Sequence, residues 1–175
     1  MENQRRKLWP YILLGVMIAF FLGTVTNKAN SVEYNPDVLK PIEGAGITVQ
    51  LPEAATTKRN RKVAFYCVWE EGILLCGQNT DAQITEAGYD PNMSLEEYAA
   101  ICAQDIENAS EIFTDEYGNV CFTYDVVNSK NALSYYVTVK RGSESFWICN
   151  FVCEQDLKEF YNAYFPHWAS LVEVE

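Results

Sequence analysis

The stretch SESFWICNFVC, residues 143–153, carries large apolar side chains on both faces of an extended chain. The two alternating sets are Phe146, Ile148 and Val152 on one face, and Trp147, Cys149 and Phe151 on the other. A strand with one face in water alternates apolar with polar residues, whereas a strand that is covered on both faces does not. The stretch therefore predicts a strand inside a sheet with a covering layer on each side.

The segments around this strand predict an antiparallel sheet, because short turns connect them. Arg141-Gly142 predicts a tight hairpin to the preceding strand, ALSYYVTVK at 132–140. The segment IFTDEYGNVCFTYDVV at 112–127 predicts further strand structure, with a turn at 117–119. Three upstream segments also predict strands: GITVQLP (46–52), RKVAFYCVWEE (61–71) and GILLCGQ (72–78).

Two segments have helical spacing instead. In SLEEYAAICAQDIENA, residues 94–109, Ser94 and Glu97 form a capping box, and apolar residues recur along one helical face. Near the C-terminus, the predicted buried helical face comprises Leu157, Phe160, Tyr161, Tyr164 and Trp168. Pro166 is incompatible with an unbroken helix, so we expect a kink or a restart there. An acidic, polar loop is expected at 79–92.

Strands joined by hairpins, together with two helices, predict an α+β sandwich in which helices cover an antiparallel sheet. The pattern resembles the PsbP-like domains, including those of small bacterial surface proteins. The resemblance rests on ITVQLP, on MSLEEYAAICAQDI, and on the run from CFTYD to FYNAYFPHWASLVEV, and it covers most of 46–175. It implies a protein that binds other proteins or assists assemblies, and it brings no catalytic residues with it.

The N-terminal segment Leu8–Val25 contains 18 residues without a charge, which is long enough to cross a bilayer core. Basic residues at positions 5–7 precede it, so the positive-inside rule keeps the N-terminus in the cytoplasm. We therefore predict a cell-membrane protein with four parts: a cytoplasmic tail (1–7), one transmembrane anchor (8–25), a spacer (26–45) and an extracytoplasmic domain (46–175). A cleaved signal peptide is the alternative, although Asn27 makes cleavage after Ala29 unfavourable.

The chain is strongly acidic, with a net charge of −11. The tail holds three of the 13 basic and one of the 24 acidic residues, which leaves 10 against 23, or −13, for the rest. This balance argues against nucleic acid as a partner and against direct docking onto anionic lipid. One basic run stands out, with Lys58, Arg59, Arg61 and Lys62. It is either a solvated loop before a strand or a contact for an acidic partner or anionic polymer.

Six cysteines in an extracytoplasmic domain favour disulfides. If Glu71-Gly72 is a two-residue turn, Cys67 faces Cys76 and the two could be linked. A three-residue loop that also includes Glu70 would place them on opposite faces. Cys149 and Cys153 lie four residues apart on one strand, roughly 13 Å, which exceeds the reach of a disulfide. We interpret Cys102 as a core residue or as half of a helix-to-sheet disulfide.

The sequence contains no recognisable catalytic, metal or cofactor motif. His167 is the only histidine, and no flanking pattern marks a cysteine as a nucleophile beside it. Zinc spacings, phosphate loops and EF-hands are also absent from the sequence. We therefore expect a binding or accessory domain with a protein partner, with no cofactor and no enzymatic activity. The alternatives are an acidic immunity or inhibitor protein against an extracytoplasmic toxin, an enzyme with scattered site residues, or a small-ligand sensor.

Overall fold

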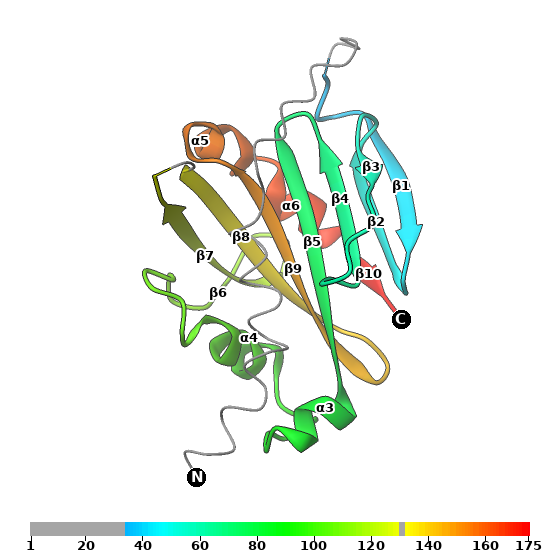
Figure 1. Ribbon diagram of the computed structural model, residues 1–175, viewed down its shortest axis with the longest axis vertical. Helices are drawn as coiled ribbons and strands as arrows, with labels where there is room; N and C mark the ends of the chain where they lie inside the picture. Colours follow the sequence, from blue (N-terminus) through cyan, green and yellow to red (C-terminus); the bar gives the residue numbers. More distant parts are fainter. Residues whose placement is uncertain (1–33, 130–131) are drawn as a thin grey trace.

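A computed structural model describes residues 34–129 and 132–175 as two antiparallel sheets with flanking helices (Figure 1). The larger sheet has the strand order β3-β4-β5-β9-β8-β7-β6, and the smaller has the order β1-β2-β10. This is the predicted α+β arrangement. The elements are β1 (Leu39–Gly44), β2 (Ile47–Pro52), β3 (Thr56–Thr57), β4 (Phe65–Trp69), β5 (Gly72–Thr80), α3 (Asp81–Glu86), α4 (Leu95–Ala103), β6 (Phe113–Thr114), β7 (Val120–Val127), β8 (Ala132–Arg141), β9 (Ser145–Glu154), η2 (Gln155–Leu157), α5 (Lys158–Tyr161), α6 (Phe165–Ser170) and β10 (Glu173–Val174).

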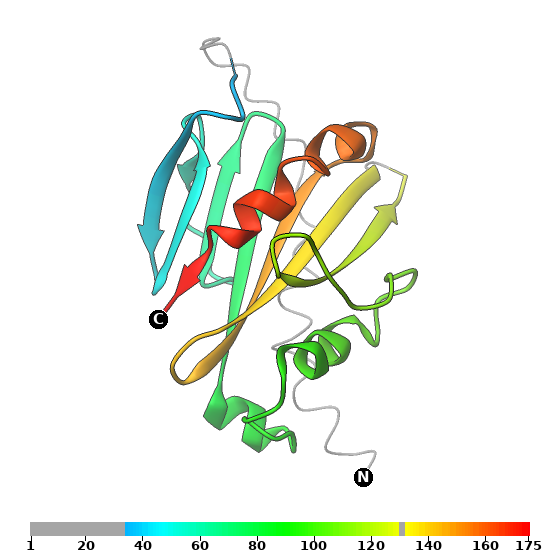
Figure 2. The ribbon, with the colours of Figure 1, turned by 180° about the vertical axis from the view of Figure 1, so that it is seen from behind.

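Strand β9 lies inside the larger sheet, between β5 and β8, as its two apolar faces predict. All its residues from Ser145 to Cys153 are buried. Trp147 and Phe151 enter the core that α6 covers, whereas Phe146 and Val152 enter the core beside α4. Figure 2 shows α6 crossing one face of the sheet. The covering layers on both sides explain why this strand has no polar face.

The C-terminal helical segment breaks at Pro166. Helix α5 ends at Tyr161, and α6 begins at Phe165 with Pro166 in its first turn, which confirms the predicted restart. Tyr161, Phe165 and Trp168 are buried, but Phe160, which we assigned to the buried face, is exposed. Aromatic residues occupy two adjacent helical stripes here, so residue type alone does not distinguish the inner stripe from the outer one.

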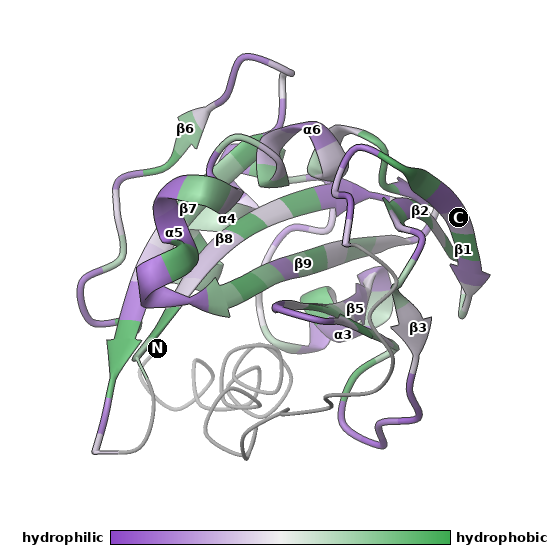
Figure 3. Ribbon diagram, turned by 90° about the horizontal axis from the view of Figure 1, so that it is seen from above, coloured by the Kyte–Doolittle hydropathy of each residue, from purple (hydrophilic) through white to green (hydrophobic). Residues whose placement is uncertain are grey.

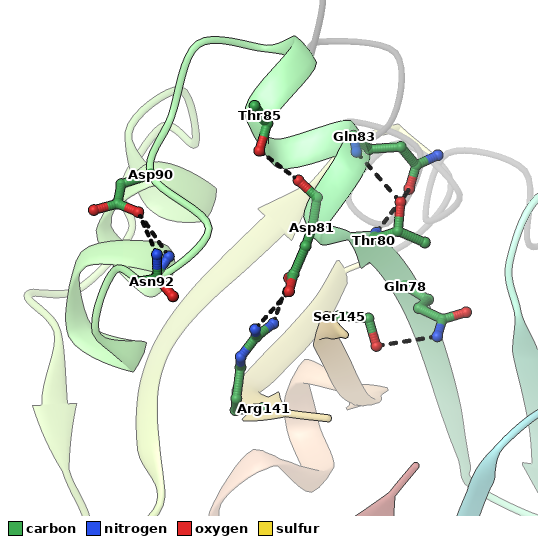
Figure 4. Close-up of polar contacts among 9 residues, drawn as sticks. All are labelled: Gln78, Thr80, Asp81, Gln83, Thr85, Asp90, Asn92, Arg141 and Ser145. Atoms are coloured by element: carbon green, nitrogen blue, oxygen red, sulfur yellow. Dashed lines mark hydrogen bonds and ion pairs between the residues drawn. The ribbon is translucent and has the colours of Figure 1, made fainter. Parts of the chain in front are cut away.

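Two elements form where the sequence predicted irregular chain. Helix α3 lies within the expected polar loop and begins with a capping box between Thr80 and Gln83 (Figure 4). Arg141, at the end of β8, forms a bidentate ion pair with Asp81 of this helix. Its two guanidinium nitrogens lie 2.6 and 2.8 Å from the carboxylate oxygens. Ile84 is the one buried residue of this helix, so its sequence lacks the apolar stripe that would predict a helix.

Strand β1 occupies residues that we assigned to the spacer. It pairs along its whole length with β2, and Ile42 contributes to the core. The folded part of the chain therefore begins before residue 46. The predicted anchor (8–25) and tail (1–7) lie outside the described residues. No helix within 34–129 or 132–175 combines the length and apolar character needed to cross a bilayer.

The β4–β5 hairpin has a register that corrects the predicted cysteine pairing. Trp69 pairs with Gly72 across a Glu70-Glu71 turn, so Cys67 faces Leu74 and not Cys76. Both thiols are free. The Trp69 indole explains the register, because a methyl group at Gly72 would lie 2.3 Å from its Cζ2 atom. The glycine is needed in the strand beneath the indole, whereas we had assigned it to the turn.

Replacing Gly72 with alanine should destabilise the domain, because the added methyl group overlaps the indole. Overpacking of a filled core costs about 1–3 kcal/mol, and we expect the upper end of this range. Trp69 has little room to move, since its ring packs against those of Tyr161, Phe165 and Trp168. The free energy of unfolding in urea, followed by tryptophan fluorescence, measures the effect.

Gly44→Ala is the matched control. A methyl group there would lie 3.7 Å from the Phe65 ring, which is ordinary van der Waals contact. We expect the control to lose less than about 0.5 kcal/mol. Equal stability of the Gly72→Ala variant and the wild type would show that the indole does not set the register.

Candidate functional site

Exposed aromatic side chains occur beside and within the β6–β7 turn and along the C-terminal helical segment. Tyr117 is 47% exposed, Phe160 44% and Phe113 42%, which is unusual for large rings. The Tyr117 ring lies 5.5 Å from that of His167, and the Phe160 ring lies 5.1 Å from that of Tyr164. Seen from above in Figure 3, β6 lies beyond β7 at one edge of the larger sheet and β3 lies at the other. We call these four residues, Tyr117, His167, Phe160 and Tyr164, the aromatic surface.

The outer stripe of the C-terminal helical segment supplies three of these residues. Phe160 and Tyr164 have rings 5.1 Å apart, and His167 lies in α6 beside Tyr117. The inner stripe, one position further along, is locked into the core by Tyr161 and Trp168. Burial of the inner stripe therefore determines which aromatic residues face outward.

A carboxylate under the β6–β7 turn positions Tyr117. Asp115 Oδ1 accepts hydrogen bonds from the backbone N–H groups of Tyr117 and Asn119, both at 2.9 Å. Asp115 Oδ2 accepts from Asn119 Nδ2 at 2.8 Å and from the Tyr136 hydroxyl at 2.5 Å. Asn119 Nδ2 also donates to the Pro166 carbonyl at 3.0 Å, which connects the turn to α6. Tyr117 is therefore held beside His167 before any partner binds.

The ionisation states in this network keep donors and acceptors in fixed roles. Burial raises the pKa of Asp115, but hydrogen bonds from Asn119, Tyr136 and the turn backbone outweigh it and hold the pKa below its usual value. Burial and the hydrogen bond to Asp115 raise the pKa of Tyr136 far above its usual value. At neutral pH the carboxylate therefore accepts and the phenol donates. Lys140, whose pKa burial lowers, donates to Asn119 Oδ1 at 2.9 Å.

Acidic residues flank the aromatic surface. Glu116 and Glu159 are exposed, and each precedes an aromatic residue of the surface in the sequence. The basic side chain of α5, Lys158, is paired with Asp125 at 2.8 Å. Exposed rings beside carboxylates attract lysine and arginine side chains through cation–π and ion-pair interactions. The surface therefore combines exposed rings with exposed carboxylates.

The predicted basic contact lies elsewhere on the fold. Lys58, Arg59, Arg61 and Lys62 are exposed in the loop between β3 and β4. Strands β3 and β6 form opposite edges of the larger sheet, so this basic loop and Tyr117, which follows β6, lie at opposite edges. Sequence reasoning missed the aromatic surface because it assigned Phe160 to the core and Tyr117 to an ordinary turn. Tyr164, which it also assigned to the core, is partly buried and packs against it.

The cysteines are poorly suited to nucleophilic chemistry. All six are free and buried. Burial raises the pKa of Cys67 to about 11, and those of Cys102 and Cys153 to about 12, which disfavours the reactive thiolate. Cys102 lies in the core beneath α4, as one of its two interpretations predicts. Within 34–129 and 132–175, no group of three or more His, Cys, Asp or Glu residues is arranged to hold a metal ion.

Two surface hollows, of about 490 and 500 Å³, lie beside Glu175. The first is lined by acidic residues of the smaller sheet, including Glu43 and Glu173. The second lies between the start of α3 and the β8–β9 turn, near Gln78 and Ser145, whose side chains are joined at 3.1 Å (Figure 4). Neither hollow is lined by His167 or a cysteine.

Comparison with known proteins finds similarity in structure alone. No family model matches the sequence, and no curated protein sequence matches it. Cyanobacterial PsbP (CyanoP) from Synechocystis sp. PCC 6803 superimposes with a TM-score of 0.51 at 13% identity, covering 88% of this chain and 99% of that one. The described domain therefore has a PsbP-like fold, as the sequence pattern predicts.

Two further solved structures are similar at lower scores. A Bacteroides thetaiotaomicron VPI-5482 protein has a TM-score of 0.49 at 11% identity, covering 77% of this chain and 47% of that one. LpqN of Mycobacterium tuberculosis, described as involved in cell envelope biogenesis, has a TM-score of 0.47 at 9% identity, covering 83% and 92%.

The Asp115→Asn substitution should destabilise the domain, and the free energy of unfolding of the variant should change less as the pH falls through the acidic range. The pKa of Asp115 is lower in the folded state than its ordinary value of 3.8. Ionised Asp115 therefore stabilises the fold above that value, and the contribution is lost as pH falls through the lowered folded pKa. At neutral pH, an asparagine amide facing these donors should cost about 1–3 kcal/mol. Urea unfolding at a series of pH values measures both effects.

Glu116→Gln serves as the control, because it removes a neighbouring exposed charge and should leave stability within about 0.5 kcal/mol of the wild type. If the Asp115→Asn variant were as stable as the wild type with the same acid dependence, the carboxylate would not hold the turn.

Proposed function

We propose that this chain is a membrane-anchored, extracytoplasmic binding domain that holds a protein partner on its aromatic surface. The observation that carries the proposal is Tyr117, which is nearly half exposed although Asp115 accepts a hydrogen bond from its backbone N–H and its ring lies beside that of His167. Aromatic residues are enriched in the energetically important centres of protein interfaces. Holding them in place before binding lowers the entropy cost of association.

The proposed location rests on the sequence of the N-terminal segment. Its uncharged run at 8–25 and the basic residues before it are typical of an anchor with the following domain outside. The expected partner is a protein of the same compartment or membrane. Its contact region should combine apolar and basic side chains, because Glu116 and Glu159 flank the exposed rings.

An inhibitor or immunity protein is the second candidate, and the acidity of the chain favours it. The net charge of −11 would accelerate association with a basic toxin. This candidate predicts that cells producing the protein survive a cognate toxin that kills cells lacking it. Equal survival with and without the protein would exclude it for that toxin.

Capture of the full-length protein from membranes of its own cells tests the principal proposal. A double variant, Tyr117→Ala with Phe160→Ala, removes two exposed rings outside the Asp115 network. We expect it to retain about a tenth or less of the partner that the wild type retains, because interface anchors contribute about 2 kcal/mol or more. Quantitative mass spectrometry of the captured proteins measures the ratio.

Two controls make the result specific. The N-terminal segment fused to an unrelated domain identifies proteins that follow the anchor alone. The variant Arg59→Glu with Arg61→Glu changes the basic loop, which lies at the edge of the sheet opposite Tyr117, and should retain the partner. A partner lost with the basic-loop variant but kept by the aromatic variant would overturn the assignment of the site. The absence of any partner above the anchor control would overturn the proposed function.

A further inference from the structure

Five of the six cysteines belong to the core layer that α6 covers, namely Cys67, Cys76, Cys121, Cys149 and Cys153. Two of them, Cys76 on β5 and Cys149 on β9, are direct partners across adjacent antiparallel strands. Both are fully buried. Residues that oppose each other in a sheet point to the same face, so the two thiols lie side by side.

The hydrogen-bond pattern of the β5–β9 ladder shows which kind of pair this is. Beyond the end of β5, the Asp81 N–H donates to the Glu144 carbonyl at 3.0 Å, which marks a hydrogen-bonded pair. The register continues without a bulge to Gly72 and Cys153, so the two kinds of pair alternate along it. Five steps from Asp81, the Cys76–Cys149 pair is therefore non-hydrogen-bonded. Its Cα atoms should lie about 4.5 Å apart, within the range that disulfides span.

The other thiols of this layer are too far from Cys76 or Cys149 to be equally good disulfide partners. Cys67 faces Leu74, so it is a diagonal neighbour of Cys76, at about 7–8 Å. Cys121 faces Thr138, which in turn faces Cys149, so two strand spacings separate Cys121 from Cys149, about 9–10 Å. Cys153 lies four residues along the same strand as Cys149, roughly 13 Å away. Cys149 is thus the best-placed partner for Cys76 among the described residues.

We propose that Cys76 and Cys149 form a disulfide when the chain folds in the presence of a disulfide donor, such as a thiol–disulfide oxidoreductase or a small disulfide. The thiolate of one cysteine attacks the donor disulfide, which forms a mixed disulfide and releases one donor thiolate. The thiolate of the second cysteine then attacks the protein sulfur of this bond and releases the second donor thiolate. The protein thiols lose two protons and two electrons, and the donor disulfide takes up the two electrons.

Burial sets the time at which this reaction occurs. In the folded domain neither thiol is accessible, and burial raises the pKa of Cys76 well above its usual value. The reaction therefore takes place before β5 and β9 close together, and the completed fold then shields the bond from reductants. A chain that folds among reductants keeps both thiols. The same sequence thus yields two stable covalent forms, depending on where it folds.

Oxidative refolding of the full-length protein in detergent tests the inference. The unfolded, reduced protein is refolded with mixed oxidised and reduced glutathione, or with reduced glutathione alone. After denaturation and alkylation, peptide mapping without reduction should find Cys76 linked to Cys149 only in the first sample. The thermal midpoint of the oxidised form should be higher by roughly 10 °C. Six alkylated cysteines in both samples, or a different linked pair, would overturn the inference.

Alanine variants at three buried positions of the same core layer provide matched controls. Cys76→Ala and Cys149→Ala should abolish the linked peptide and the difference in midpoint between oxidised and reduced samples, whereas Cys67→Ala should keep both. If one variant does not fold, the wild-type peptide map still decides the pairing. Protein alkylated directly on extraction from its own membranes then tests the location separately. If the two cysteines are linked after refolding but are free in cells, the disulfide inference stands and the proposed extracytoplasmic location is contradicted.

Discussion

The packing of the Trp69 indole over Gly72 is the constraint on which the rest of the domain depends. Gly72 provides the space for the ring, and the ring in turn contacts the C-terminal aromatic residues of α5 and α6. Trp69 Nε1 donates to the Tyr161 hydroxyl at 3.1 Å, and that hydroxyl lies 3.0 Å from the hydroxyl of Tyr34. One side chain thereby joins the β4–β5 hairpin to the helices and to the beginning of the described chain.

The two proposed features of the molecule are both consequences of this packing. The hairpin register that accommodates the indole moves Cys67 away from Cys76, and β9 brings Cys149 opposite Cys76. Burial of Tyr161 against Trp69 sets the rotation of the C-terminal helical segment. That rotation turns Phe160 outward, next to Tyr164, and so creates part of the aromatic surface. The core and the candidate binding surface are therefore not independent.

The candidate site could be predicted only in part, because single aromatic residues give ambiguous signals. Both Phe160 and Tyr161 fit a buried helical face, and packing against Trp69 decides between them. From the sequence alone, Tyr117 is an ordinary turn residue. The hydrogen bond that supports its turn joins Asp115 to Tyr136, 21 positions away, and only the folded structure reveals it. The basic loop was easier to recognise, since exposure of a charged run requires no tertiary contact.

The sequence by itself determined the local features and the class of fold. The two-faced strand at 143–153, the capping box at Ser94 and the break at Pro166 follow from backbone and side-chain preferences of neighbouring residues. Tertiary structure alone decided the β4–β5 register, the pairing of β1 with residues of β2, and the facing of Cys76 by Cys149. The reason is physical: alternation along a strand repeats every two residues and leaves several registers equivalent. The contacts made in the folded structure, such as those of the Trp69 indole with Gly72 and with the C-terminal rings, make one of them lower in free energy.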